Sequence, residues 1–219
     1  MWNSQVIIRL LEGIRDTRYM TLASTLCGYI IGLPMGLVLT VTDKDGIRPN
    51  AAVYKVLDVI SNLLRSIPFI ILLIVLIPFT RFVVGRSYGS TATIVPLTIA
   101  AAPYIARMVE SSLKEVDAGV IEAARSMGAS DFQIVTKVML VEARTSLIVG
   151  ATISLGTILG YSAMAGTVGG GGLGDIAIRY GYTRWQTDIM VVTVVLLVIL
   201  FQIFQTIGMK IANRLDRRK

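Results

Sequence analysis

Long segments with few or no charged residues constrain this chain more than any other feature. A helix needs roughly 20 apolar residues to cross the hydrocarbon core of a bilayer. Four uncharged segments are long enough, and they cover 19–42, 87–106, 145–174 and 189–209. A fifth, 66–80, reaches that length only if it extends back through Arg65 towards Val59, with Pro68 near its middle. The sequence therefore predicts an all-α integral membrane protein with five transmembrane helices, at about 19–42, 59–80, 88–107, 145–168 and 188–209.

Composition then narrows the chemistry that such a bundle can perform. The chain is 54% apolar and 16% charged, and it contains no histidine and a single cysteine, Cys27. Histidine-based acid–base catalysis, a histidine or cysteine metal site and an intrachain disulfide are thereby excluded. No G-x-x-x-x-G-K-[ST] motif occurs, so the chain has no nucleotide-hydrolysing loop of its own. We predict no catalytic residue, no metal and no cofactor bound by this chain.

The distribution of basic residues predicts which side of the membrane each loop faces. With five spans, seven Lys and Arg residues fall on the side of the N-terminus and thirteen on the opposite side, with Arg65 left unassigned. Because basic residues accumulate in cytoplasmic loops, the N-terminus is expected outside and the C-terminus in the cytoplasm. The same bias explains the net charge of +7 without nucleic-acid binding.

The two ends of the chain are expected to differ from the bundle between them. Apolar residues at helical spacing, Ile7, Leu10, Leu11 and Ile14, predict an interfacial helix over 1–16. A cleaved signal peptide is the rival interpretation, but the apolar run continues well past the usual length of such a segment. The transmembrane domain is then expected over 17–212, followed by a basic cytoplasmic tail, 213–219.

Two spans carry glycines at four-residue spacing. Gly28, Gly32 and Gly36 lie in the first span, and Gly156 and Gly160 in the fourth. Small residues at this spacing allow neighbouring helices to approach closely in a membrane, so we interpret them as packing positions.

The fourth span also offers candidates for a translocation pathway or gate. Tyr161, Ser162 and Met164 combine polar groups with a flexible thioether, although ordinary packing explains Met164 equally well. The glycine-rich stretch that follows, 169–175, is expected to form a tight turn, which acts as a structural loop or an outer gate.

Ionisable residues within the spans are too few to suggest an energy source there. Apart from residues at the span ends, only Arg65 falls inside a predicted span. Asp58, seven residues before it, could pair with Arg65, but Lys55 is an equally good partner for Asp58. The cytoplasmic segment 107–144 is a better candidate, because it divides into two helical pieces around Gly128. The second piece begins with a capping box formed by Ser130 and Gln133.

That segment resembles a known motif. Glu122, Ala123, Ala124 and Gly128, followed by an apolar end at 138–140, are similar to the EAA motif of type I ABC importer permeases. Val138 stands where isoleucine is usual, and Val141 where proline is usual. The resemblance implies that this segment, between the third and fourth spans, is a coupling helix that docks into a cleft of a separate ATPase subunit.

Further segments resemble the methionine importer permeases within that family, namely 65–73, 101–110, 160–166, 169–175 and 179–182. The resemblance implies a homodimer in the bacterial inner membrane, in contact with lipid, that imports D- and L-methionine. It also implies two ATPase subunits that bind ATP and Mg²⁺, and an extracytoplasmic methionine-binding lipoprotein. A permease for another amino acid or small solute remains open, as does an ATP-independent secondary transporter or channel.

Overall fold

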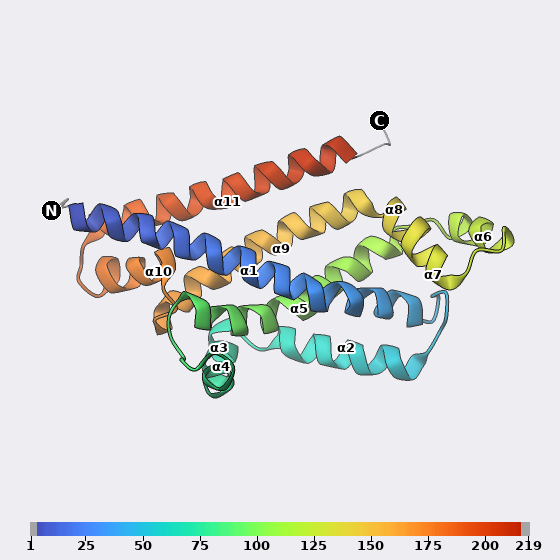
Figure 1. The fold of residues 1–219 in the computed structure, drawn as a ribbon, viewed down its shortest axis with the longest axis horizontal. Coiled ribbons are helices and arrows are strands. Elements are labelled where there is room, and N and C mark those ends of the chain that lie inside the picture. The colour runs from blue at the N-terminus through green and yellow to red at the C-terminus, as the bar shows by residue number, and fades with distance from the viewer. Residues whose placement is uncertain (1–3, 216–219) are drawn as a thin grey trace.

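The computed structural model describes residues 4–215 as an elongated helical bundle (Figure 1). Four helices in this part of the chain are long and apolar enough to cross a membrane, or five if the bent pair α2 and α3 forms one span. The N-terminal end of α1 lies at one end of the bundle, and the short helices α6 and α7 lie at the other. We call the end that carries α6 and α7 the coupling end.

The first helix, α1 (Ser4–Thr42), is continuous over 39 residues. At about 1.5 Å per residue it is about 58 Å long, which exceeds the roughly 30 Å hydrocarbon core. The helix predicted over 1–16 is present over residues 4–16, but the predicted boundary between it and the first span is wrong, because the two form one helix along the same axis (Figure 1). Helix α10 packs against this part of α1: a Cβ added at Gly13 would lie 2.5 Å from the side chain of Ile176. At the next residue beyond this part, Thr17 Oγ1 accepts a hydrogen bond of 2.8 Å from Leu173 N. Residues 1–3 lie outside the described part of the chain.

The predicted second span, 59–80, is not one helix. Helix α2 (Ala51–Ser66) ends at Ile67, α3 (Phe69–Val75) turns away from it by 101°, and α4 (Ile77–Val84) follows. Proline disfavours the helical conformation in the residue before it and has no N–H to donate. Ile67 is accordingly extended, with ψ 124°. Pro68 thus breaks the segment that was predicted as one span with this proline near its middle.

The third span, α5 (Ser90–Lys114), packs along α1 in the centre of the bundle. The glycines of α1 make this close approach possible. A Cβ added at Gly32 would lie 2.6 Å from the carbonyl oxygen of Ala102, and one at Gly36 would lie 2.6 Å from that of Ala106. A Cβ at Gly28 would meet Ala101 Cβ at 2.9 Å. The four-residue spacing in the sequence corresponds to one helix face pressed against α5.

The C-terminal half consists of α9 (Arg144–Ala165), a 3₁₀ turn η2 (Gly166–Val168), α10 (Gly172–Ile176), a π-helical segment η3 (Ala177–Tyr182) and α11 (Thr187–Leu215). The tight turn predicted after α9 is present, since Gly169 and Gly171 have φ values of 78° and 80°. Of the predicted tail 213–219, residues 213–215 complete α11, and 216–219 lie outside the described residues.

The two glycines of α9 have different surroundings. A Cβ at Gly156 would lie 2.6 Å from the ring of Phe201 on α11, so this glycine allows the two helices to pack. A Cβ at Gly160 would meet nothing within 4 Å. The prediction that Gly160 packs against a neighbouring helix is therefore wrong within residues 4–215, because no other element of this part of the chain reaches that face of α9.

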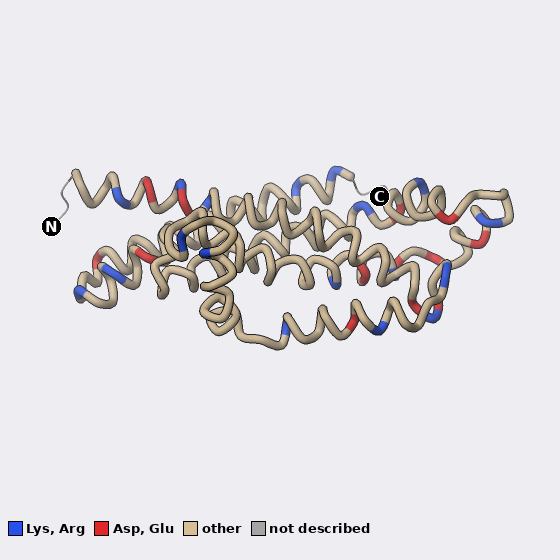
Figure 2. Tube along the Cα trace, turned by 60° about the horizontal axis from the view of Figure 1, so that its bottom comes forward, with Lys and Arg blue, Asp and Glu red and all other residues tan. Residues whose placement is uncertain are grey.

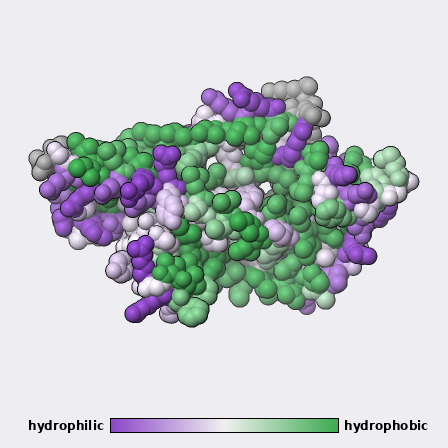
Figure 3. All heavy atoms as spheres, in the orientation of Figure 1, coloured by the Kyte–Doolittle hydropathy of each residue, from purple (hydrophilic) through white to green (hydrophobic). Residues whose placement is uncertain are grey.

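The surface divides into an apolar middle and polar ends. Charged residues cluster at the two ends of the bundle, with few along the helices between them (Figure 2). The space-filling view shows the same pattern, a hydrophobic band bounded by hydrophilic residues (Figure 3). This distribution matches a bundle whose middle lies in lipid and whose ends lie in water.

Candidate functional site

The coupling end is built around a hairpin of short helices, which we call the coupling hairpin (residues 118–142). Its first arm is α6 (Ala118–Ser126), whose N-terminus is capped by Asp117 through a 2.8 Å hydrogen bond from Gly119 N. The second arm comprises α7 (Asp131–Gln133), a π-helical segment η1 (Ile134–Met139) and α8 (Leu140–Glu142), which leads directly into α9. The predicted pair of helical pieces is confirmed.

Local sequence fixes the turn between the two arms. Gly128 has a φ of 83°. Glycine adopts this left-handed conformation at little cost. The predicted capping box is present: Gln133 N donates to Ser130 Oγ at 3.4 Å, and Ser130 N donates to Gln133 Oε1 at 2.9 Å. The helix then continues through Val141, where the related motif usually has proline, and first breaks at Ala143.

The residues of α6 that resemble the EAA motif differ in their exposure to solvent. Ala124 is buried against the second arm, where Ile134 is fully buried. Glu122 and Ala123 are exposed. A small residue at 124 lets the arms pack together, while the side chains of 122 and 123 remain accessible to solvent.

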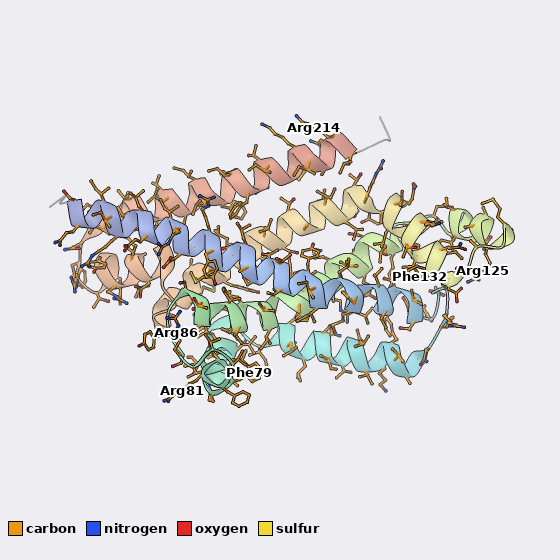
Figure 4. The ribbon with its side chains drawn as sticks, viewed as in Figure 1. Phe79, Arg81, Arg86, Arg125, Phe132 and Arg214 are labelled. Carbon is orange, nitrogen blue, oxygen red and sulfur yellow. The ribbon has the colours of Figure 1, made fainter. Side chains whose placement is uncertain are left out.

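Two polar contacts hold the coupling hairpin to the loop that follows α1. The Arg125 guanidinium donates a 3.1 Å hydrogen bond to the carbonyl oxygen of Ile47. Arg48 lies 3.7 Å from the Asp131 carboxylate. Arg125 and Phe132 mark this end of the molecule in Figure 4. Between α6 and the same loop lies a cavity of about 430 Å³, which Glu122 and Arg125 help to line.

A chain of ion pairs extends from that loop across α5 to α2. Asp43 accepts from Lys114 at 2.6 Å, Lys114 also pairs with Glu110 at 2.8 Å, and Arg107 pairs with Glu110 at 2.7 Å and with Asp58. We call these five residues the ionic chain. Glu110, only 4% exposed, lies at its centre between two cations. Because a buried carboxylate is stable only when paired, the ionic chain fixes α5 relative to α2 and to the end of α1.

The pKa of the Asp43 carboxyl group is lowered by its surroundings. The hydrogen bond from Lys114 lowers the pKa of Asp43 below its ordinary value of 3.8, and this effect outweighs the opposing influence of burial. Asp43 is therefore ionised throughout the neutral range.

Both partners suggested for Asp58 from sequence are wrong. Asp58 pairs with Arg107 rather than with Arg65 or Lys55, and it also accepts a 3.1 Å hydrogen bond from Asn62 Nδ2. Arg107 lies 49 residues further along the chain, so no helical spacing could indicate this pair. The ionic chain was missed by sequence reasoning for the same reason.

Two exposed apolar side chains at the tip of the coupling hairpin were also missed. Met127 is 82% exposed and Phe132 is 77% exposed, on either side of the Gly128 turn. Large apolar residues so exposed outside the hydrophobic band are typical of a protein-binding surface. Their position in the sequence, next to the Gly128 turn and the capping box, could have indicated that they lie at the tip of the hairpin.

The structure separates the three candidate pathway residues of α9. Tyr161 lines a cavity with Arg65 and stacks on Phe69, with ring centroids 4.6 Å apart. Ser162 is buried, and its hydroxyl donates to the carbonyl oxygen of Leu159 at 2.7 Å, so it does not line that cavity. Met164 is 46% exposed.

These features define the class of the protein: an all-helical, multi-pass membrane protein with a folded hairpin projecting from one end of its bundle. Residues 28–219 match the family of binding-protein-dependent transport system inner membrane components, and the chain belongs to this family. The type I permease fold predicted from the sequence is confirmed.

Individual relatives extend the likeness to most of the chain. A probable D-methionine transport system permease protein MetI from Vibrio cholerae is 48% identical over 95% of this chain and 93% of its own length. The D-methionine transport system permease protein MetI of Escherichia coli K12 is 54% identical over 72% of each chain. A solved structure of the MetNI methionine ABC transporter in an inward-facing conformation superimposes with a TM-score of 0.97, at 49% identity, over 99% of this chain and all of that one.

Proposed function

We propose that this chain is the permease subunit of an ABC importer that carries D- and L-methionine across the bacterial inner membrane, powered by a separate ATPase subunit. The observation that carries the proposal is the coupling hairpin, with Met127 and Phe132 exposed at its tip, in a chain similar over nearly its whole length to a methionine ABC transporter. ATP and Mg²⁺ bind to the ATPase, and this chain supplies the path through the membrane.

In this proposal the coupling hairpin inserts into a cleft of the ATPase subunit. Burying the side chain of Met127 or Phe132 contributes about 1.5–3 kcal/mol each. The exposed carboxylate of Glu122 is accessible to the wall of the cleft. The resemblance of 122–124 and 128 to the EAA motif supports the same assignment.

Movement of the docked hairpin reaches the membrane helices by three routes. Its second arm continues into α9 through α8. Its first arm follows α5 after a short connection, 115–117. Arg125 connects it to the loop after α1, and the ionic chain joins that loop to α5 and α2. A shift of the hairpin therefore moves these helices together, and ATP binding needs to favour one of two packed arrangements by only a few kcal/mol.

Five spans rarely enclose a path alone, so we propose a homodimer that binds two ATPase subunits on the coupling end. That end lies in the cytoplasm together with the C-terminus, and the N-terminus lies outside. An extracytoplasmic methionine-binding lipoprotein delivers substrate to the opposite end. The larger number of basic residues at the coupling end supports this orientation.

The docking assignment is tested by Phe132→Asp, with Phe132→Leu as its matched control. A charge introduced into an apolar cleft should abolish co-purification with the ATPase subunit and reduce methionine uptake into proteoliposomes at least tenfold. The leucine variant should retain both. If Phe132→Asp binds the ATPase and transports like the wild type, the hairpin tip is not the docking surface.

The substrate assignment is tested by competition. Uptake of labelled L-methionine should fall when unlabelled D- or L-methionine is added in excess, and should be unaffected by amino acids of unrelated chemistry. Competition by an unrelated amino acid and not by methionine would refute the assignment.

A further inference from the structure

The break between α2 and α3 creates a small cavity in the bundle. It has a volume of about 180 Å³ and is lined by Arg65 and Phe69 from the break, Tyr104 from α5 and Tyr161 from α9, together with aliphatic side chains. A single ordered water needs only about 15 Å³, so the cavity has room for part of a small solute. Irregular backbone at membrane depth is tolerated where it lines such a cavity.

Among residues 4–215, Arg65 is the only charged residue that lines this cavity, and it lies far from the coupling end. It is 14 residues along α2 from Ala51. At about 1.5 Å per residue, this places it roughly 21 Å from the start of that helix. Tyr104, beside it in the cavity, lies in the interior of α5. A guanidinium at this depth is costly unless it faces water or an anion.

Nothing in the described chain supplies that anion. Within residues 4–215, no hydrogen bond or ion pair joins Arg65 to another side chain, and no residue lining the cavity is acidic. Arg107 differs, because Asp58 and Glu110 neutralise it. The fold thus satisfies one arginine with its own carboxylates and leaves the other, which is exposed, lining a cavity without an internal anion.

The remaining walls suit an apolar group joined to that anion. Phe69 and Tyr161 stack with an interplanar angle of 5°. Aromatic rings interact favourably with a thioether sulfur, by about 0.3–1.5 kcal/mol, and with an ammonium group above their faces. The Tyr104 hydroxyl lies 3.4 Å from Thr157 Oγ1, which adds a polar group beside the aromatic rings.

We propose that this cavity is a substrate site within the membrane domain, in which Arg65 binds the α-carboxylate of the transported amino acid and the aromatic residues contact its ammonium group and side chain. This rests on the proposed function, and it assigns to Arg65 the role of the principal binding residue. Zwitterionic amino acids with a flexible apolar side chain are the expected ligands.

The test uses the complete transporter in proteoliposomes, with its ATPase and binding protein, and three variants. Arg65→Gln removes the charge, Arg65→Lys retains it, and Arg81→Gln is the matched control, because Arg81 is an arginine on α4 outside the cavity (Figure 4). Methionine uptake should fall at least tenfold in Arg65→Gln and less than threefold in Arg65→Lys. Uptake by Arg81→Gln should stay within twofold of the wild type.

A second measurement identifies the site independently of turnover. Photo-methionine, a methionine analogue with a diazirine in its side chain, should label the peptide that contains Tyr161 in the wild-type complex, and excess methionine should suppress this labelling. Arg65→Gln should reduce the labelling at least tenfold. Correct assembly of each variant is verified by co-elution of the permease with the ATPase.

The outcomes separate the site from the proposed function. If the wild type takes up methionine, and Arg65→Gln is labelled and takes up methionine to the same extent as the wild type, the substrate site is refuted and the proposed function stands. If the wild type takes up another solute instead of methionine, the proposed function fails. If Arg65 instead binds a lipid phosphate, an anionic lipid should co-purify with the wild type and be lost in Arg65→Gln. Photo-methionine should then give no methionine-sensitive labelling of the wild type. This result would also refute the substrate site.

Discussion

Replacing Gly32 with alanine tests whether close contact between α1 and α5 holds the bundle together. The added Cβ would lie 2.6 Å from the carbonyl oxygen of Ala102 and 2.9 Å from Ile105 Cβ, so a helix backbone must move to admit it. Gly160→Ala is the matched control, since it makes the same change inside a helix where nothing lies within 4 Å.

The magnitude follows from two opposing effects. Alanine is favoured over glycine inside a helix by about 0.8–1 kcal/mol, and both variants gain this. Overpacking costs about 1–3 kcal/mol, and only Gly32→Ala incurs it. The two variants should therefore differ by about 1–3 kcal/mol, with Gly160→Ala the more stable.

Thermal unfolding of the purified protein in detergent measures this difference. For a chain of this size, about 1 kcal/mol corresponds to about 2–4 °C in Tm, so Gly32→Ala should unfold roughly 2–12 °C below Gly160→Ala. Equal Tm values for the two variants, or a higher value for Gly32→Ala, would refute the argument that the glycine face of α1 is required for packing.

The remaining predictions concern the coupling end. Glu110→Ala should destabilise the protein by about 1–3 kcal/mol, because Arg107 and Lys114 lose the carboxylate that they share. Each cation keeps one partner, Asp58 for Arg107 and Asp43 for Lys114. Thermal unfolding measures the effect, and an unchanged Tm would contradict it. Asp43→Asn should lower Tm at neutral pH. Because the folded-state pKa of Asp43 is lowered, the ionised carboxylate stabilises the fold above the ordinary value of 3.8, and this stabilisation is lost as the pH falls through the folded-state pKa. The Tm values of the wild type and of Asp43→Asn should therefore converge in acid. A difference in Tm that grows in acid would contradict the lowered pKa. Gly128→Ala should weaken binding of the ATPase subunit, because alanine is strained at the positive φ of this position and the hairpin turn must change. Co-purification with the ATPase measures the binding. Binding equal to that of the wild type would show that the turn geometry is not required.

Features that depend on neighbouring residues in the chain could be predicted from the sequence. The capping box of Ser130 and Gln133 needs only a three-residue spacing, and the left-handed turn at Gly128 needs only a glycine between two helical segments. The long spans follow from uncharged runs, because the cost of a charge in hydrocarbon is a property of composition. The glycine face of α1 likewise follows from a repeat of four residues.

Features that depend on distant parts of the chain could not be predicted. Asp58 and Arg107 are 49 residues apart. Near Asp58 in the sequence, Lys55 and Arg65 were equally plausible partners. Pro68 indicated an irregularity, but the 101° turn after it depends on how α3 packs against α5 and α9. Gly160 has the same spacing from Gly156 as the packing glycines of α1 have from one another, and only the placement of α11 distinguishes the two positions.

The most direct test of the proposed function is methionine uptake by proteoliposomes that contain the permease, its ATPase subunit and the binding protein, with and without ATP on the side of the membrane that contacts the ATPase. Labelled methionine should accumulate only when ATP and Mg²⁺ are present on that side and all three components are included. Accumulation in vesicles that contain the permease alone, or accumulation at an equal rate without ATP, would contradict the account and identify the chain as an ATP-independent transporter.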